Sequence, residues 1–331
     1  MRVPLDAWES DNIFMRHNRI KCLTLALLLC LSGCGGGGGE TEGQSTVHAA
    51  SGSEKTESTK THYQIPEFAD SAFHADKATG DDKAQIDLSA VASGYVAVSA
   101  KADSRLKFQV IKGEDTYTYN VANDGTPSIF PVQCGDGVYT FRVMVNTTET
   151  NYAVMYTTDQ EVKLTDEFQP FLRPSDYVSY SKTSECVKKA GELAEEAEDA
   201  VAFVAAVFEY ICDSVTYDRE KASTVQNNKS YLPDPDETLR TGKGICFDYA
   251  ALAAAMLRSQ GIPTKMVFGN VSPDNLYHAW NMFYTEETGW VTVDYEVKSG
   301  DWNRLDLTFS ANGADGTFIG DGGNYADVYY Y

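Results

Sequence analysis

The chain has 331 residues, of which 27 are basic and 48 are acidic, so its formal net charge is −21. This length suits about two domains, and a hydrophobic fraction of 43% allows most of the chain to bury a core. A field this negative repels phosphate backbones, so we expect no nucleic-acid partner.

The first 34 residues have the pattern of an export signal. A basic stretch at residues 16–21 precedes an apolar run, Cys22 to Leu31, that is too short to span a bilayer. The run ends in Leu31-Ser32-Gly33-Cys34, which resembles a bacterial lipobox. We therefore predict a signal peptide over residues 1–34, lipidation at Cys34 and an extracytoplasmic, lipid-anchored protein. The alternative is an ordinary secretory signal with an incidental cysteine.

Residues 35–64 are rich in Gly, Ser, Thr, Glu and Lys and almost lack large apolar side chains. Burial cannot offset the entropy of ordering such a segment, so we predict a disordered linker.

Short strands separated by turns dominate the next segment, and we predict a β-sandwich domain over residues 65–162. Apolar and polar residues alternate with period two, and the runs recur about every ten residues, as in an antiparallel sandwich. The clearest runs are residues 94–98, 106–110, 117–121 and 139–143. Residues 84–162 contain no His and one cysteine, Cys134, so we expect no catalysis there.

The pattern changes near residue 165, and we predict an α+β domain over residues 163–331. Apolar stripes with helical spacing predict helices over residues 184–196, 199–215 and 246–259. Strand-like runs follow at residues 264–269, 277–284 and 290–296, the last two joined by a hairpin loop.

Cys246 occupies the first turn of the third predicted helix, which is rich in Ala. The positive end of a helix dipole favours thiolate, and the free amides of the first turn can hold an oxyanion. The opposing interpretation is a buried cysteine that acts as a small hydrophobic residue.

His278 is the single His after residue 74, and it lies on an apolar strand. If Tyr284 pairs with Trp290 across the hairpin, Asp294 becomes the diagonal neighbour of His278 on one face. Cys, His and Asp together form a thiol acyl-transfer set: nucleophile, base and the residue that orients the base. The alternative for His278 is a hydrogen-bonded core residue.

Residues 180–296 resemble the transglutaminase-like superfamily of papain-type thiol enzymes. Five stretches carry the resemblance: residues 210–218, 239–250, 255–263, 278–281 and 289–294. The resemblance implies a papain-like α+β fold with Cys246 as nucleophile, His278 as base and Asp294 as the orienting residue. The family often has Asp-Pro-Thr at the third position, where this chain has Asp294-Tyr295-Glu296, so Glu296 could compete for His278.

Several other residues have roles that the sequence leaves open. We expect Asp248 to cap the helix or to form a hydrogen bond near its start, with a part in catalysis as the alternative. Tyr217 or Gln226 could donate a hydrogen bond to an oxyanion. Trp280 and Trp290 are core or cleft-wall aromatics. No His/Cys cluster has metal-ligand spacing, so we expect no metal and no cofactor.

We therefore expect a surface lipoprotein that acts on amide bonds of a protein or peptide, as a transglutaminase-like acyltransferase or a cysteine protease. The alternative is a non-catalytic binding or structural lipoprotein built on the same scaffold.

The remaining thiols suggest a structural bridge. If the first two predicted helices run antiparallel, Cys186 and Cys212 differ by only about 5 Å in height along the pair. An exported protein can keep a disulfide, so we predict a Cys186–Cys212 bond, with two unpaired thiols as the alternative.

Overall fold

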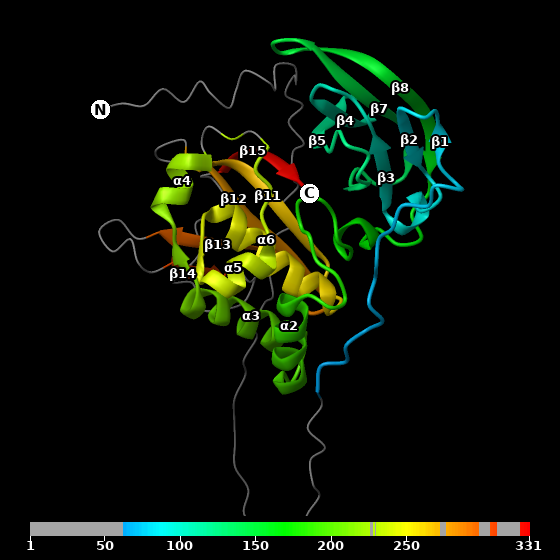
Figure 1. Cartoon of the computed structure of the whole chain (residues 1–331). Helices are drawn as coiled ribbons and strands as arrows, with labels where there is room; N and C mark the ends of the chain where they lie inside the picture. The colour runs from blue at the N-terminus through cyan, green and yellow to red at the C-terminus, as the bar shows by residue number, and fades with distance from the viewer. Residues whose placement is uncertain (1–61, 226–227, 229, 272–275, 298–304, 310–324) are drawn as a thin grey trace, which may run out of the picture.

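The computed structural model describes residues 62–225, 228, 230–271, 276–297, 305–309 and 325–331 (Figure 1). The predicted signal peptide, Cys34, nearly all of the predicted linker and Gln226 lie outside these residues. Within them, no helix is both long and apolar enough to cross a membrane. The predicted domain boundaries stay predictions.

Two four-stranded antiparallel sheets form the N-terminal part of the described chain. The first has the order β1 (Thr79–Gly80), β2 (Ala84–Asp87), β3 (Tyr95–Ala100), β6 (Ser128–Pro131). The second has the order β5 (Asp115–Val121), β4 (Leu106–Lys112), β7 (Gly137–Thr148), β8 (Asn151–Val162). Short 3-10 turns, η1 (Val91–Ser93) and η2 (Gln169–Phe171), lie in the connections.

The two sheets share one apolar core, as the period-two pattern predicts. Phe108 from β4 stacks on Phe130 from β6, with ring centroids 4.9 Å apart, and both side chains are fully buried. The antiparallel β-sandwich is therefore confirmed. The β7–β8 hairpin is longer than the sequence pattern indicates, with 12 residues in each strand.

A second α+β part follows and contains a five-stranded antiparallel sheet. Its order is β14 (Leu305–Phe309), β13 (Gly289–Val297), β12 (Leu276–Thr285), β11 (Thr264–Val271), β15 (Tyr325–Tyr330). The helices are α2 (Glu185–Glu196), α3 (Ala200–Ser214), α4 (Arg219–Val225), α5 (Pro235–Thr241) and α6 (Cys246–Ser259). A two-residue parallel pairing joins β9 (Thr216–Tyr217) to β10 (Lys243–Gly244).

Helix α6 forms the centre of this part and contacts α2, α3, α5, β11 and β12 (Figure 1). Every residue from Tyr249 to Leu257 is fully buried. Five of them are alanines, whose small side chains let the surrounding elements approach the helix closely. The three helices predicted from apolar stripes are confirmed, and α6 begins and ends where predicted. The polar residues 219–241, for which no helix was predicted, contain α4 and α5.

Arg258, near the end of α6, holds three segments of the chain together. Its guanidinium is buried and donates to the carbonyls of Thr264 (2.8 Å), Arg173 (3.0 Å) and Tyr331 (2.8 Å). The Tyr331 ring in turn packs edge-on against Tyr119 of the sandwich, with centroids 5.5 Å apart. The C-terminal residue thus contacts both the sandwich and the α+β part.

The prediction of a Cys186–Cys212 disulfide is wrong, because the structure contains no disulfide among the cysteines that it describes. Cys186 is buried and lies beside Asp236 of α5. Its amide donates to the Asp236 carboxylate at 2.9 Å, and burial together with a thiol hydrogen bond to Asp236 raises the pKa of Cys186. The first turn of α2 therefore pairs with α5. Helical rise sets the height of Cys186 and Cys212, but the rotation of each helix sets the direction of their side chains.

Tyr63, near the C-terminal end of the predicted linker, contacts the α+β part. Tyr63 stacks on Phe203 of α3 with centroids 5.4 Å apart, its amide donates to Ala197, and its hydroxyl donates to the Gln260 carbonyl at 2.8 Å.

Candidate active site

Cys246 is the first residue of α6 and is partly exposed, whereas the middle of the helix is fully buried. The amides of a first helical turn have no intrahelical partner and face outward along the helix axis. The thiol therefore lies beside free backbone donors and the positive end of the helix dipole, as predicted.

Asp248 caps this helix. Its carboxylate accepts a hydrogen bond from the Ile245 amide at 2.8 Å, and its side chain is fully buried. The prediction that Asp248 caps the helix is confirmed. The carboxylate takes up one of the orphan amides, so the first turn can begin inside the protein without an unsatisfied donor at that position.

Gly244 makes room for this cap. A Cβ atom at Gly244 would lie 2.8 Å from the Asp248 Cβ atom and 3.3 Å from the Thr238 Cγ2 atom. Position 244 needs a glycine because Asp248 and Thr238 lie close to its backbone, and not because its φ angle is positive. The spacing Gly-Ile-Cys-Phe-Asp thus places the thiol between a residue that must be small and a carboxylate that holds the helix start.

His278 lies on β12, where its backbone pairs with Gly269 of β11. Its half-buried ring is 6.3 Å from the ring of Trp280, centroid to centroid. Side chains alternate along the strand, and Asn281 is on the other face, where its amide donates to the Ala250 carbonyl of α6 at 3.0 Å. His278 and Trp280 therefore share one face of β12.

Cys246 and His278 lie at the same end of the α+β part. β11 turns back after α6 and β12 turns back again, so β12 runs in the same direction as α6. From the Asn281–Ala250 contact, His278 is about 10 Å back along the strand and Cys246 about 6 Å back along the helix. The structure thus brings β12 to the start of α6, with the His278 side chain on the face of the strand opposite to Asn281.

The predicted pairing of Tyr284 with Trp290 is confirmed, and the register holds through Asn281–Val293. One more step would place Asp294 opposite Trp280, on the face that carries His278. The Asp294 backbone pairs with Thr308 of β14. The side chains of Asp294 and Glu296 lie outside the described residues, so the choice between them as partner of His278 stays a prediction.

Tyr217 is a neighbour of the thiol. Its backbone pairs with Gly244, two residues before Cys246. Burial, with further contributions from the charges of Cys246 and Asp248, raises the pKa of Tyr217 to about 12, so the hydroxyl keeps its proton at neutral pH. Within the described part of the chain, that hydroxyl has no hydrogen-bond partner. Gln226, the other predicted donor, lies outside the described residues.

The two tryptophans have different surroundings. Trp280 is buried beside His278, at the candidate site. Trp290 lies 5.6 Å from Tyr284, centroid to centroid, and the Lys265 ammonium lies 3.8 Å from its ring centroid. Trp290 therefore belongs to an aromatic cluster near the hairpin loop and not to the surroundings of Cys246.

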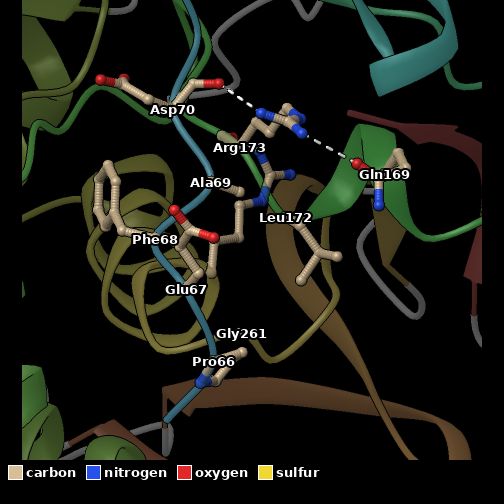
Figure 2. A pocket seen from close by; sticks show the side chains of 10 residues that line it. Pro66, Glu67, Phe68, Ala69, Asp70, Gln169, Leu172, Arg173 and Gly261 are labelled. Atoms are coloured by element: carbon tan, nitrogen blue, oxygen red, sulfur yellow. Dashed lines mark hydrogen bonds between the residues drawn. The ribbon is translucent and has the colours of Figure 1, made fainter.

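A pocket of about 460 Å³ lies at the opposite end of α6. Figure 2 shows Arg173 in its wall, bonded to the Asp70 carbonyl and to Gln169, with Pro66 and Gly261 below. Arg258 also lines it, so the 14-residue length of α6, about 20 Å, separates this pocket from Cys246. Among the described residues, no three His, Cys, Asp or Glu side chains are grouped to hold a metal ion.

Residues 187–295 match the family model of the transglutaminase-like superfamily. The chain contains a transglutaminase-like domain. This confirms the resemblance found in the sequence, and the match includes α6, β11, β12 and nearly all of β13.

The relatives of this chain are distant. YebA of Bacillus subtilis is 27% identical over 212 residues, which are 57% of this chain and 28% of YebA. MJ1282 of Methanocaldococcus jannaschii is 29% identical over 73 residues, 21% of either chain. The chain thus spans between about a fifth and somewhat over a quarter of these relatives. A solved structure from Cytophaga hutchinsonii, described as a candidate cysteine protease, is 15% identical with a TM-score of 0.36, covering 70% of this chain and 89% of that one.

Replacing Gly244 by Ala tests the packing at the start of α6. The added methyl group collides with Asp248, and overpacking of this kind costs about 1–3 kcal/mol of unfolding free energy. Urea denaturation measures the loss. The matched control is Gly191→Ala in α2, where the new Cβ atom meets only Gln260 Oε1 at 4.0 Å. The control should stabilise by about 0.5–1 kcal/mol, because Ala favours helix. Equal effects of both substitutions would contradict the close-approach argument.

Proposed function

We propose that this protein is a thiol acyl-transfer enzyme that acts on amide bonds of a protein or peptide. The observation that carries the proposal is the position of Cys246: partly exposed, at the start of a buried helix, at the end of the domain reached by the His278 strand. The transglutaminase-like match supports it.

In the proposed reaction His278 takes the Cys246 proton as the sulfur attacks the carbonyl carbon. The C–N bond then breaks, and the leaving amine takes that proton from His278. The resulting thioester is resolved by water, which gives hydrolysis, or by an amine, which gives cross-linking. Asp294 orients the imidazole and stabilises its protonated form.

Developing negative charge on the carbonyl oxygen needs donors that are already in place. The Cys246 amide is one, because a first-turn amide has no intrahelical acceptor. The Tyr217 hydroxyl is our candidate for the other, since it is neutral, close to the thiol and without a partner in the described part of the chain.

The rival proposal is a non-catalytic binding protein in which the sandwich recognises the partner and the second part is an idle scaffold. Selective alkylation of Cys246 by iodoacetamide at neutral pH favours the enzyme, because an idle scaffold has no physical need for a reactive thiol.

Substitution of the proposed set tests the mechanism. Cys246→Ala and His278→Ala should each lower kcat by at least about 10⁴-fold, because the members act as a unit. Asp294→Asn should lower kcat by a smaller factor. The readout is turnover of peptide libraries with and without an amine donor, and Cys134→Ala in the sandwich is the matched control. A Cys246→Ala protein with full activity would refute the mechanism.

Tyr217→Phe tests the oxyanion donor. Removing one such donor lowers kcat by about 10²–10³-fold, and KM changes little because the bond forms mainly in the transition state. Alkylation of Cys246 by iodoacetamide, which needs no oxyanion donor, should keep its rate. If kcat stays unchanged, the donor lies elsewhere.

Lipidation at Cys34 would place this enzyme on the outer side of the membrane. We expect Cys34→Ala to move the protein from the membrane to the soluble fraction, because no other cysteine follows the apolar run closely. Cys30→Ala, within that run, is the control and should stay at the membrane. Fractionation with an immunoblot measures both, and unchanged partition of Cys34→Ala would exclude the lipid anchor.

A further inference from the structure

The proposed mechanism does not use the buried carboxylate of Asp248, yet this group lies two residues from the nucleophile. The Asp248 side chain is fully buried. A buried carboxylate is costly unless it is paired and hydrogen-bonded. Its surroundings therefore matter for any reaction at Cys246.

Three donors surround the Asp248 carboxylate. Oδ2 accepts from the Ile245 amide at 2.8 Å and from the Lys221 ammonium at 2.8 Å, and Oδ1 accepts from the Tyr231 hydroxyl. Burial, and then the hydrogen bond to Asp248, raise the pKa of Tyr231, so this hydroxyl stays a donor. The ammonium is thus the one cation among these three donors.

Lys221 reaches this site from α4, a separate short helix. Its ammonium also lies 5.0 Å from the centre of the Tyr231 ring, and its side chain is 25% exposed. The Asp218 carboxylate accepts from the Lys221 amide at 2.9 Å and so helps to hold this turn of α4. The pair Lys221–Asp248 connects α4 to the start of α6.

We propose that Lys221 is a positioning residue of the thiol site, which balances the buried charge of Asp248 so that thiolate can form on Cys246 beside it. The inference rests on the proposed function, since it assigns a role in preparing the nucleophile. An unbalanced carboxylate two residues from Cys246 disfavours a negative charge on the thiol. A carboxylate that is paired with a cation does so much less.

The titratable groups at the start of α6, in the part of the chain that the structure describes, come from several elements. They are Asp248 and Tyr249 on α6, Lys221 on α4, Tyr231 and Asp234 before α5, and Tyr217 on β9. The three tyrosines are neutral at pH 7. Lys221 is therefore the basic side chain that contacts the carboxylate, at 2.8 Å.

The pH profile of Cys246 alkylation by iodoacetamide tests this role in the full-length protein without any substrate. The modified peptide is quantified by mass spectrometry between pH 5 and pH 10. We expect Lys221→Met to move the midpoint of the profile upward by about one pH unit, and Lys221→Arg to restore it. Asp248→Asn should move the midpoint downward, because it leaves the ammonium unbalanced.

Lys189→Met is the matched control. Lys189 pairs with Glu192 at 3.2 Å and lies 4.9 Å from the centre of the Tyr210 ring, but its carboxylate partner is exposed and on α2. The midpoint of Cys246 alkylation in Lys189→Met should equal that of the wild type. Lys221→Met with an unchanged midpoint, or Lys221→Met and Asp248→Asn moving it in the same direction, would overturn the proposal.

The design separates this inference from the proposed function. If the wild type transfers no acyl group but the two substitutions move the midpoint in opposite directions, the charge balance stands and the enzyme proposal fails. If Lys221→Met does not fold, Lys221→Arg and Asp248→Asn decide: an Asp248→Asn midpoint at or above that of Lys221→Arg overturns the inference.

Discussion

The burial of helix α6 on all sides is the constraint on which the rest of the α+β part depends. A helix without exposed residues from Tyr249 to Leu257 must have small side chains, and its ends must find hydrogen-bond partners inside the protein. At its start, Asp248 supplies an acceptor and Gly244 the space for it. At its end, Arg258 supplies donors to three carbonyls. The Cys246 thiol lies at the point where the helix first becomes accessible.

The sheet reaches this helix through one specific polar contact. The Asn281 amide donates to the Ala250 carbonyl, although both groups are buried and Ala250 is already part of a helix. A slip of β12 by one residue would take Asn281 off the helix and carry His278 to the other face. The contact therefore holds the register of the strand, and with it the face of β12 that carries the imidazole. Apolar packing alone would specify the register of β12 less strictly, because apolar residues occupy both faces of the strand.

The sequence predicts those features that arise from local patterns. The apolar stripes predict α2, α3 and α6, and the hairpin predicts the pairing of Tyr284 with Trp290. It does not predict α4 and α5, which are short, polar and without an apolar stripe, so the contact of Lys221 with Asp248 has no signal in the chain. The prediction of a Cys186–Cys212 disulfide is wrong for a related reason. Helical rise gives the height of a residue, but its azimuth depends on neighbours such as Asp236, 50 residues away.

Arg258 also has a consequence for cooperativity. Its guanidinium is buried, and burial lowers its pKa to about 10, which leaves it charged at neutral pH. The carbonyls that solvate it come from the segment after the sandwich, from the start of β11 and from the last residue. If any of these segments detached, a charge would remain in the core with unsatisfied donors. Partial opening at this junction is therefore costly, and the sandwich and the α+β part should unfold as one unit despite their separate cores.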